Sequence, residues 1–426
     1  MKEDIQRFKD ALQLLYGNDP GILDKQLKRY SNLADLFRTK FGDLEMQFFS
    51  TPGRTEIGGN HTDHNHGRVL AGSINLDSVA IASGNESATV RIHSAGYNDP
   101  FEVTLDDLEA KEEEYGTTTS LIRGIAARLK ELGYKIEGFN ACITSDVLPG
   151  SGLSSSASIE VLIGNMFSAL FNENQIKPEI LAMTGQYAEN NFFGKPCGLM
   201  DQVACAMGGI VTIDFEDPGQ AKIEKVEFDF DAQDYALLVV DTGGTHADLT
   251  DDYAAVPAEM KSVALALGGN VCRDISKKDF MAGLKHLRAD TGDRAVLRAM
   301  HFLGDNQRVA DQVQALANGD FQSFLQLVSE SGSSSYKRLQ NIYTSKSTRE
   351  QGVALALALT EDYLRDINAG ACRVHGGGFA GTIQEFLQNQ AVAGFRDLLE
   401  PVYGEGSVHV LKIRQPGTVH LNSFPQ

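Results

Sequence analysis

A glycine- and serine-rich segment, PGSGLSSSAS (Pro149–Ser158), lies between a stretch typical of a strand (139–146) and an apolar stretch typical of a helix (154–171). Its glycines let the backbone turn tightly and approach a ligand closely. The helix that follows offers free N–H groups and a positive dipole end, and the serine hydroxyls can contact phosphate oxygens or Mg²⁺. The lysine of a Walker A loop is missing. Two interpretations follow: a phosphate-binding loop, or a capped helix after a flexible loop.

Composition limits the class of protein. A chain of 426 residues is long enough for two or three domains, and 42% hydrophobic with 22% charged residues is typical of a globular enzyme. The 38 basic and 57 acidic residues give a net charge of −19, so we expect neither nucleic acid nor a membrane surface as a partner. No apolar stretch is long enough to span a bilayer. Five cysteines without CxxC spacing indicate reduced thiols and a cytoplasmic location.

The hydrophobic pattern predicts a mixed fold. Residues 1–40 have apolar positions at helical spacing with a break at 18–21, which indicates two helices. Strand patterns dominate up to Pro218, and helical patterns fill most of 258–367. This order is typical of an α+β protein in two lobes. The expected strands include 78–82, 88–93, 101–105, 139–146, 236–241, 382–386 and 407–413, further helices are 117–132 and 393–402, and the serine run at 329–335 is expected to be a loop between helices.

A second polar segment, GRTEIGGNHTDHNHGRVL (Gly53–Leu70), crowds ionisable residues into what reads as a glycine-punctuated loop. Fixed donors and acceptors of this kind suit a ligand rich in hydroxyl groups. One alternative is a solvated loop. Another is a metal site formed by His61, His64 and His66 with Asp63, although that spacing is not a standard one.

Two shorter motifs follow. Asp201 lies in the otherwise apolar segment Cys197–Gly209, where a carboxylate is either paired structurally or poised for proton chemistry. The glycine run His375–Gly381 is either a tight turn or a second stretch of backbone that faces a nucleotide.

In this order, the four motifs resemble the galactokinase branch of the GHMP small-molecule kinases. Gly53–Asn65 is similar to the family's sugar motif, Pro149–Ser158 to its phosphate loop, Cys197–Gln202 to the segment with its catalytic aspartate, and His375–Gly381 to its third motif. The resemblance implies a two-lobed α+β fold. An N-terminal lobe like ribosomal protein S5 (36–218) and a ferredoxin-like C-terminal lobe (219–426) would follow a helical extension (1–35).

The activity that the resemblance implies is phosphorylation of galactose at its anomeric hydroxyl by ATP with Mg²⁺. By motif position, Asp201 is the catalytic base and Arg54 its ionic partner, while Ser156 and Glu189 match the Mg²⁺ ligands. The matching sugar contacts are Asn60, His61, Asp63, Gly198 and Tyr253, the last at the family's spacing from His246; the matching nucleotide contacts are Gly150, Ser151, Gly152, Leu153, Ser154, Ser155 and Ser156.

The sequence departs from the family pattern at several positions. Asn60 replaces a glutamate that usually contacts the sugar's 6-hydroxyl, and His64 replaces a tyrosine. Leu121 stands where a tyrosine is common, and the chain has no tryptophan to flank the adenine. The alternatives are therefore a GHMP kinase acting on N-acetylgalactosamine, galacturonate or arabinose, and a non-catalytic galactose sensor. Asp63 disfavours a diphosphomevalonate-type or homoserine kinase, because those substrates are not vicinal diols.

Overall fold

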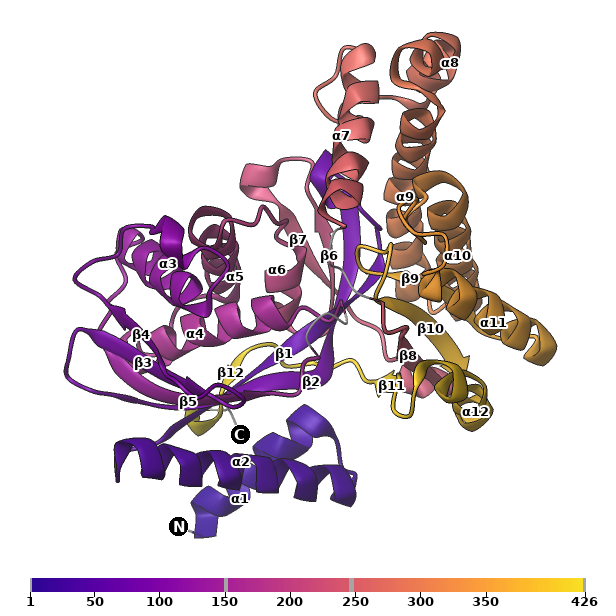
Figure 1. Ribbon diagram of the computed structural model, residues 1–426. Coiled ribbons are helices and arrows are strands. Elements are labelled where there is room, and N and C mark those ends of the chain that lie inside the picture. The colour runs from indigo at the N-terminus through magenta and orange to yellow at the C-terminus, as the bar shows by residue number, and fades with distance from the viewer. Residues whose placement is uncertain (1, 149–151, 245–248, 424–426) are drawn as a thin grey trace.

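The protein, seen here as a computed structural model, is described at residues 2–148, 152–244 and 249–423. These residues form two lobes, each built on its own sheet (Figure 1). The first sheet has the strand order β12-β1-β2-β5-β3-β4, with β6 paired to β2 and to β7. Its strands are β1 (Gln47–Gly58), β2 (Arg68–Gly84), β3 (Thr89–Ser94), β4 (Phe101–Thr104), β5 (Phe139–Ser145), β6 (Ile210–Asp214), β7 (Lys222–Val226) and β12 (Val419–His420).

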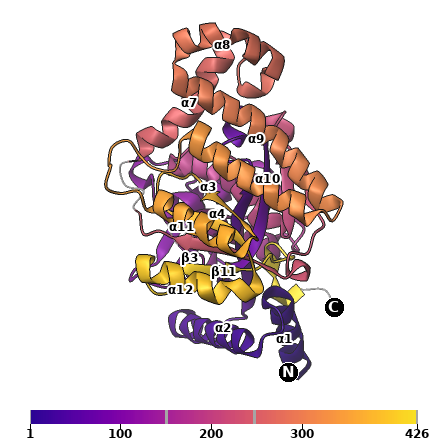
Figure 2. The same ribbon diagram turned by 90° about the vertical axis from the view of Figure 1, so that its right-hand side faces the viewer.

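The second sheet is antiparallel, with the order β11-β8-β10-β9. Its strands are β8 (Tyr235–Asp241), β9 (Ala371–His375), β10 (Thr382–Gln388) and β11 (Val408–Leu411). Helices α9 to α12 lie along the side of this lobe that faces the viewer in Figure 2. The helices of this lobe are α7 (Thr250–Ala266), α8 (Lys277–Thr291), α9 (Asp293–Ala317), α10 (Phe321–Ser334), α11 (Gly352–Ile367) and α12 (Val392–Tyr403).

The first sheet is covered by helices on both faces (Figure 1). Alternate residues of β2 point to opposite faces, as the strand geometry requires. Ala80 and Ala82 pack into the core beneath α3 (Thr118–Glu131), α4 (Ser155–Phe171), α5 (Pro178–Ala188) and α6 (Met200–Met207). Val79 and Ile81 pack against α1 (Lys2–Tyr16) and α2 (Pro20–Phe41). The continuous apolar run of β2 is therefore explained by burial on both faces.

A shared apolar cluster joins the two lobes. Side chains from the first lobe and from the second lobe pack into one buried group, so the lobes meet through a core rather than through surface contacts. Its members include Ile57, Leu70 and Leu153 from the first lobe and Val239, Phe324 and Phe386 from the second. This cluster fixes the places where the motifs of the two lobes face each other.

Most expected elements are confirmed, including the two N-terminal helices. Two expectations are wrong. The first part of the predicted polar loop is strand β1, which is buried from Phe49 to its end and therefore places even Arg54 in the interior. The serine run 329–335 is the end of α10 and the start of a short π-helix (Ser335–Leu339), because its hydroxyls bond buried partners in the protein. The lobe limit at residue 218 stays a prediction; β7 and β12 both lie beyond it and belong to the first sheet.

A buried charge cluster fastens the N-terminal helices to the first sheet. The carboxylate of Asp77, on β2, accepts hydrogen bonds from Arg29 (2.6 Å), Tyr16 (2.5 Å) and Arg414 (3.0 Å), and from the hydroxyl of Ser50. Burial raises the pKa of Asp77, but the two guanidinium groups and hydroxyls outweigh it and leave that pKa below its usual value. Its stabilising effect is therefore complete at neutral pH and is lost as the pH falls through this lowered value.

No helix among the described residues is long and apolar enough to cross a membrane.

We expect Asp77→Ala to lower the free energy of unfolding by about 3–5 kcal/mol, because Arg29 and Arg414 lose their buried counter-charge. Urea denaturation at pH 7 measures this change. The control is Asp35→Ala, which removes an exposed pair with Arg38 and is expected to change stability by less than about 0.5 kcal/mol. Equal effects of the two variants would contradict the structural role of the cluster.

Candidate active site

The centre of the site is an ion pair between Arg54 and Asp201. Arg54 lies on β1 and is 7% exposed, and its Nε and Nη2 are each 2.7 Å from Oδ1 of Asp201. Asp201 lies in the first turn of α6 and keeps 31% of its side chain exposed, so a ligand can reach it. The Nη1 of Arg54 donates to the carbonyl oxygen of Gly152, and the hydroxyl of Ser154 donates to Oδ2 of Asp201. The predicted catalytic pair is thus joined directly to the glycine–serine loop.

The surroundings of Asp201 keep its carboxylate ionised. Burial raises the pKa of Asp201. The charge of Arg54 and the hydrogen bonds from Arg54 and Ser154 lower it by more than burial raises it, so the pKa lies below the usual value. The position near the N-terminus of α6 also favours a negative charge. At neutral pH the group is therefore a proton acceptor.

The described part of the glycine–serine loop leads straight into α4. Gly152 (φ +71°) and Ser154 (φ +59°) both adopt the left-handed conformation, and α4 begins at Ser155. The free N–H groups of this helix therefore start beside Arg54 and Asp201, which suits an anionic group. Leu153 is fully buried in the core between the lobes, and its carbonyl oxygen accepts a hydrogen bond from the backbone N–H of Arg54 (3.0 Å). Gly150 and Ser151 lie outside the described residues.

A second group of charged side chains surrounds Glu189. Its buried carboxylate is 3.3 Å from Nζ of Lys195 and accepts a 3.1 Å hydrogen bond from Nε2 of Gln202. The same Nε2 donates to Oε2 of Glu160 (2.9 Å). The sequence interpretation missed Lys195, Gln202 and Glu160. The signals in the sequence are that Lys195 lies between Glu189 and Asp201, that Gln202 directly follows Asp201, and that Glu160 is a carboxylate inside an apolar helix.

Four of the predicted sugar residues converge on one another or on the glycine turn of the second lobe. A methyl group added to Gly198 would collide with Oδ2 of Asp63, so the backbone at Gly198 lies against that carboxylate. The Nε2 of His61 lies 2.8 Å from the carbonyl oxygen of Gly377, and the hydroxyl of Tyr253 donates a hydrogen bond to the carbonyl oxygen of Gly378 (2.8 Å). Burial lowers the pKa of His61 to about 4, so its ring is neutral; Nε2–H donates and Nδ1 is left as an acceptor. His246 lies outside the described residues.

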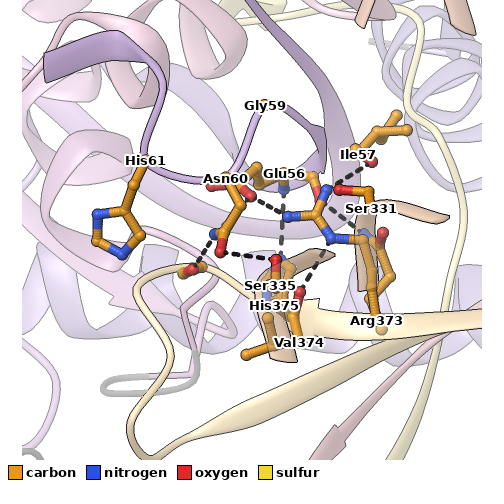
Figure 3. Close-up of polar contacts among 12 residues, drawn as sticks. Glu56, Ile57, Gly59, Asn60, His61, Ser331, Ser335, Arg373, Val374 and His375 are labelled. Carbon is orange, nitrogen blue, oxygen red and sulfur yellow. Dashed lines mark hydrogen bonds and ion pairs between the residues drawn. The ribbon is translucent and has the colours of Figure 1, made fainter. Parts of the chain in front are cut away.

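Asn60 is placed differently from its neighbour His61. In Figure 3, dashed lines join Asn60 to several neighbouring residues, whereas His61 lies to one side of this network. Its Nδ2 donates to Oε1 of Glu56 (3.0 Å) and to the carbonyl oxygen of Gly376 (2.6 Å). Its Oδ1 accepts from Asn341 (2.8 Å) and Ser335 (3.3 Å). The amide thus forms its full set of hydrogen bonds within the protein and is completely buried.

The histidines of this segment do not form a metal centre. Among residues 2–148, 152–244 and 249–423, no three His, Cys, Asp or Glu side chains converge as ligands. The interpretation of His61, Asp63, His64 and His66 as a metal site is therefore wrong. The Nε2 of His64 lies 3.8 Å from Oδ1 of Asp63, but the Nε2 of His61 lies 2.8 Å from the carbonyl oxygen of Gly377 instead.

Residues 120–209 match the family model described as the GHMP kinases N terminal domain, and residues 35–84 match the galactokinase galactose-binding signature. The two-lobed fold is also similar to that of the mevalonate kinase from Methanococcus jannaschii (TM-score 0.61, 17% identity, 87% of this chain and 98% of that one). Fold and site together define a kinase of the GHMP class.

Comparison with individual proteins shows which branch of the GHMP kinases the chain resembles. The galactokinase of Glaesserella parasuis is 30% identical over 377 residues, which cover 86% of this chain and 92% of that protein. The galactokinase of Lactococcus lactis subsp. lactis is 28% identical over 88% of this chain and 92% of its own length. A crystal structure of a Lactococcus lactis galactokinase complexed with galactose is similar over 92% of this chain and 99% of that one (TM-score 0.77, 26% identity). The chain belongs to the galactokinase family.

We expect Arg54→Met to raise the pKa of Asp201 above its value in the unchanged protein, because burial remains while the counter-charge and its hydrogen bonds are lost. Carboxyl-carbon NMR of a protein labelled at aspartate follows this titration, and Asp201→Asn identifies the signal. The control is Arg288→Met, which removes an exposed partner of Asp293 and leaves Asp201 unchanged. An Asp201 pKa equal in both variants would contradict the electrostatic role of Arg54.

Proposed function

We propose that the chain transfers the terminal phosphoryl group of ATP to the anomeric hydroxyl of galactose, forming galactose 1-phosphate and ADP. The observation that carries this proposal is the ionised Asp201, held by Arg54 and Ser154 beside the first turn of α4. An acceptor carboxylate next to a helix N-terminus that suits phosphate is the minimal geometry for phosphoryl transfer to a hydroxyl group. Membership of the galactokinase family supports galactose as the acceptor.

In the proposed reaction, Asp201 accepts the proton of the sugar O1 hydroxyl while the O1–P bond forms and the bond from phosphorus to ADP breaks. Its 31% exposed carboxylate is open to the sugar. Arg54 has two roles: it keeps Asp201 ionised, and through the carbonyl of Gly152 it fixes the loop that holds the phosphates. Such catalysis rests on positioning and charge neutralisation.

For the sugar, we assign recognition to Asp63, to the backbone at Gly198, and to His61 and Tyr253. The neutral ring of His61 has its Nε2–H committed to Gly377, which leaves Nδ1 to accept from a sugar hydroxyl. Asp63 next to Gly198 supplies a carboxylate that accepts from neighbouring hydroxyls. A wrong epimer would leave these partly buried groups unpaired, which gives the site its selectivity.

For the nucleotide, we assign Mg²⁺ to Ser156 and Glu189, with Gly150–Ser156 around the phosphates. The donor set fits this ion, since a hydroxyl and a carboxylate are hard oxygen ligands and Mg²⁺ binds few protein groups besides phosphates and water. When bound, Mg²⁺ neutralises charge on the phosphates. Gln202 and Lys195 hold the Glu189 carboxylate in place. Leu121 is buried in the core and offers no aromatic surface to the base.

A cytoplasmic location is also part of the proposal. It is supported by the five cysteines, all of which are free thiols.

The proposal is tested by ADP release with MgATP and a panel of sugars: galactose, glucose, N-acetylgalactosamine, galacturonate and arabinose. We expect turnover with galactose to exceed that with the others by about tenfold or more, since one unpaired buried polar group costs about 1–3 kcal/mol. Asp201→Asn should lower turnover about 10²–10⁴-fold while calorimetry shows retained galactose binding. The control Asp290→Asn, on the exposed side of α8, should keep full turnover.

Turnover with another sugar of the panel would support the proposed phosphoryl transfer but show that the substrate is that sugar and not galactose. Binding of galactose without turnover of any sugar would instead favour the sensor. Unchanged turnover in Asp201→Asn would remove this residue from the mechanism.

We expect Glu189→Gln to weaken binding of MgADP about tenfold or more while binding of ADP in EDTA changes little, because the charged metal ligand is lost. Calorimetric titration with and without Mg²⁺ separates the two. Glu131→Gln, which changes an exposed carboxylate on α3, serves as the control. Equal weakening of MgADP and metal-free ADP would show that Glu189 does not act through the metal.

A further inference from the structure

Three successive carbonyl oxygens of the glycine turn in the second lobe are bound by three residues that the sequence predicts as sugar contacts. Gly376 accepts from Asn60, Gly377 from His61 and Gly378 from Tyr253. Gly376 (φ +64°) and Gly378 (φ +77°) adopt the left-handed conformation, which presents their carbonyls in this arrangement. A side chain at Gly378 would also collide with the carbonyl oxygen of Asn341.

The same turn lies against the phosphate loop at its other end. A methyl group added to Gly152 would lie 3.1 Å from Nδ1 of His375, so the two motifs are in van der Waals contact. The His375 ring is held by Thr55 on β1 (3.1 Å) and by Thr382 on β10 (2.9 Å). The turn thus connects the sugar residues with the loop that contacts Arg54.

Asn60 is hydrogen-bonded within the protein through both its backbone and its side chain. Its backbone N–H donates to Asp305 (3.0 Å) and its carbonyl oxygen lies 2.9 Å from Nε2 of His301. Its Glu56 partner is paired with Arg373, whose Nη1 also donates to the carbonyl oxygen of Ile57 (2.9 Å) (Figure 3). Both lobes therefore meet at this one amide, and no hydrogen-bonding capacity of the amide is left for a sugar.

We propose that Asn60 is a positioning residue that locks the turn 376–378 onto the sugar loop and thereby couples sugar binding to nucleotide binding, in place of a contact with the sugar's 6-hydroxyl. The inference rests on the proposed kinase function. A sugar that restricts the motion of His61 and Tyr253 also restricts the carbonyl groups of Gly377 and Gly378 that they bind. Because His375 begins this turn and lies against Gly152, the motion of the phosphate loop is restricted as well. The second ligand then loses less conformational entropy, so each ligand tightens the other by the same factor.

The test is calorimetry of galactose binding with and without the magnesium complex of a non-hydrolysable ATP analogue. We expect the analogue to tighten galactose binding at least about fivefold in the unchanged protein, the lower end of common coupling. In Asn60→Ala this factor should fall to about one, while galactose affinity without nucleotide changes less than about threefold and the preference for galactose over 6-deoxygalactose stays the same. If galactose is not the substrate, the sugar that supports turnover and its 6-deoxy analogue take its place, which keeps this test separate from the test of the reaction.

Two further variants complete the design. Asn140→Ala removes another buried asparagine of the first lobe, which lies on β5 and accepts a hydrogen bond from Asn85 (3.0 Å), and should retain full coupling. Asn341→Ser removes the hydrogen bonds from the second lobe to Asn60 and Gly377, so it should also abolish the coupling between the two ligands. This variant replaces Asn60→Ala in the test if Asn60→Ala does not fold. Absence of coupling in the unchanged protein, full coupling in the folded Asn60 or Asn341 variant, or a changed 6-deoxy preference in Asn60→Ala would each overturn the proposal.

Discussion

The ion pair between Arg54 and Asp201 is the interaction on which the arrangement of the site depends. It joins strand β1 to the start of α6, and the remaining donors of Arg54 reach the glycine–serine loop before α4. Three separate segments of the chain therefore meet at one guanidinium group. The pair resists dissociation because it is largely shielded from water, and it stays reactive because the carboxylate is still partly exposed. Stability and reactivity come from the same contact.

Strand β1 carries this pair and the contacts between the lobes. Arg54 faces the reaction centre, Glu56 pairs with Arg373 of the second lobe, and the loop that follows β1 presents His61 and Asp63. Because β1 is hydrogen-bonded along its length to β2, these side chains hold fixed spacings. The strand also packs, through Ile57, into the buried cluster between the lobes. A rigid carrier of this kind gives the catalytic groups the precision that phosphoryl transfer requires.

Periodicity and composition predicted most helices and strands, because regular burial leaves a regular pattern in the sequence. They failed where polar residues are buried. β1 looked like a loop since Arg54 and Glu56 are charged, and the end of α10 looked like a loop since it is rich in serine. The motif resemblance predicted Arg54 beside Asp201, and the structure has the two in contact, but it gave no sign that Ser154 binds Asp201. Apart from Glu56, the partners of Asn60 lie some 241 to 316 residues away along the chain. Pattern within a segment carries no signal for such contacts.

Proton and phosphorus NMR of the product of MgATP and galactose shows which hydroxyl group of the sugar receives the phosphoryl group. We expect a sugar phosphate whose phosphorus correlates with the anomeric proton H1, since Asp201 is proposed to activate the hydroxyl group at that carbon. A correlation with the protons at C6, or inorganic phosphate as the only phosphorus product besides ADP, would contradict it.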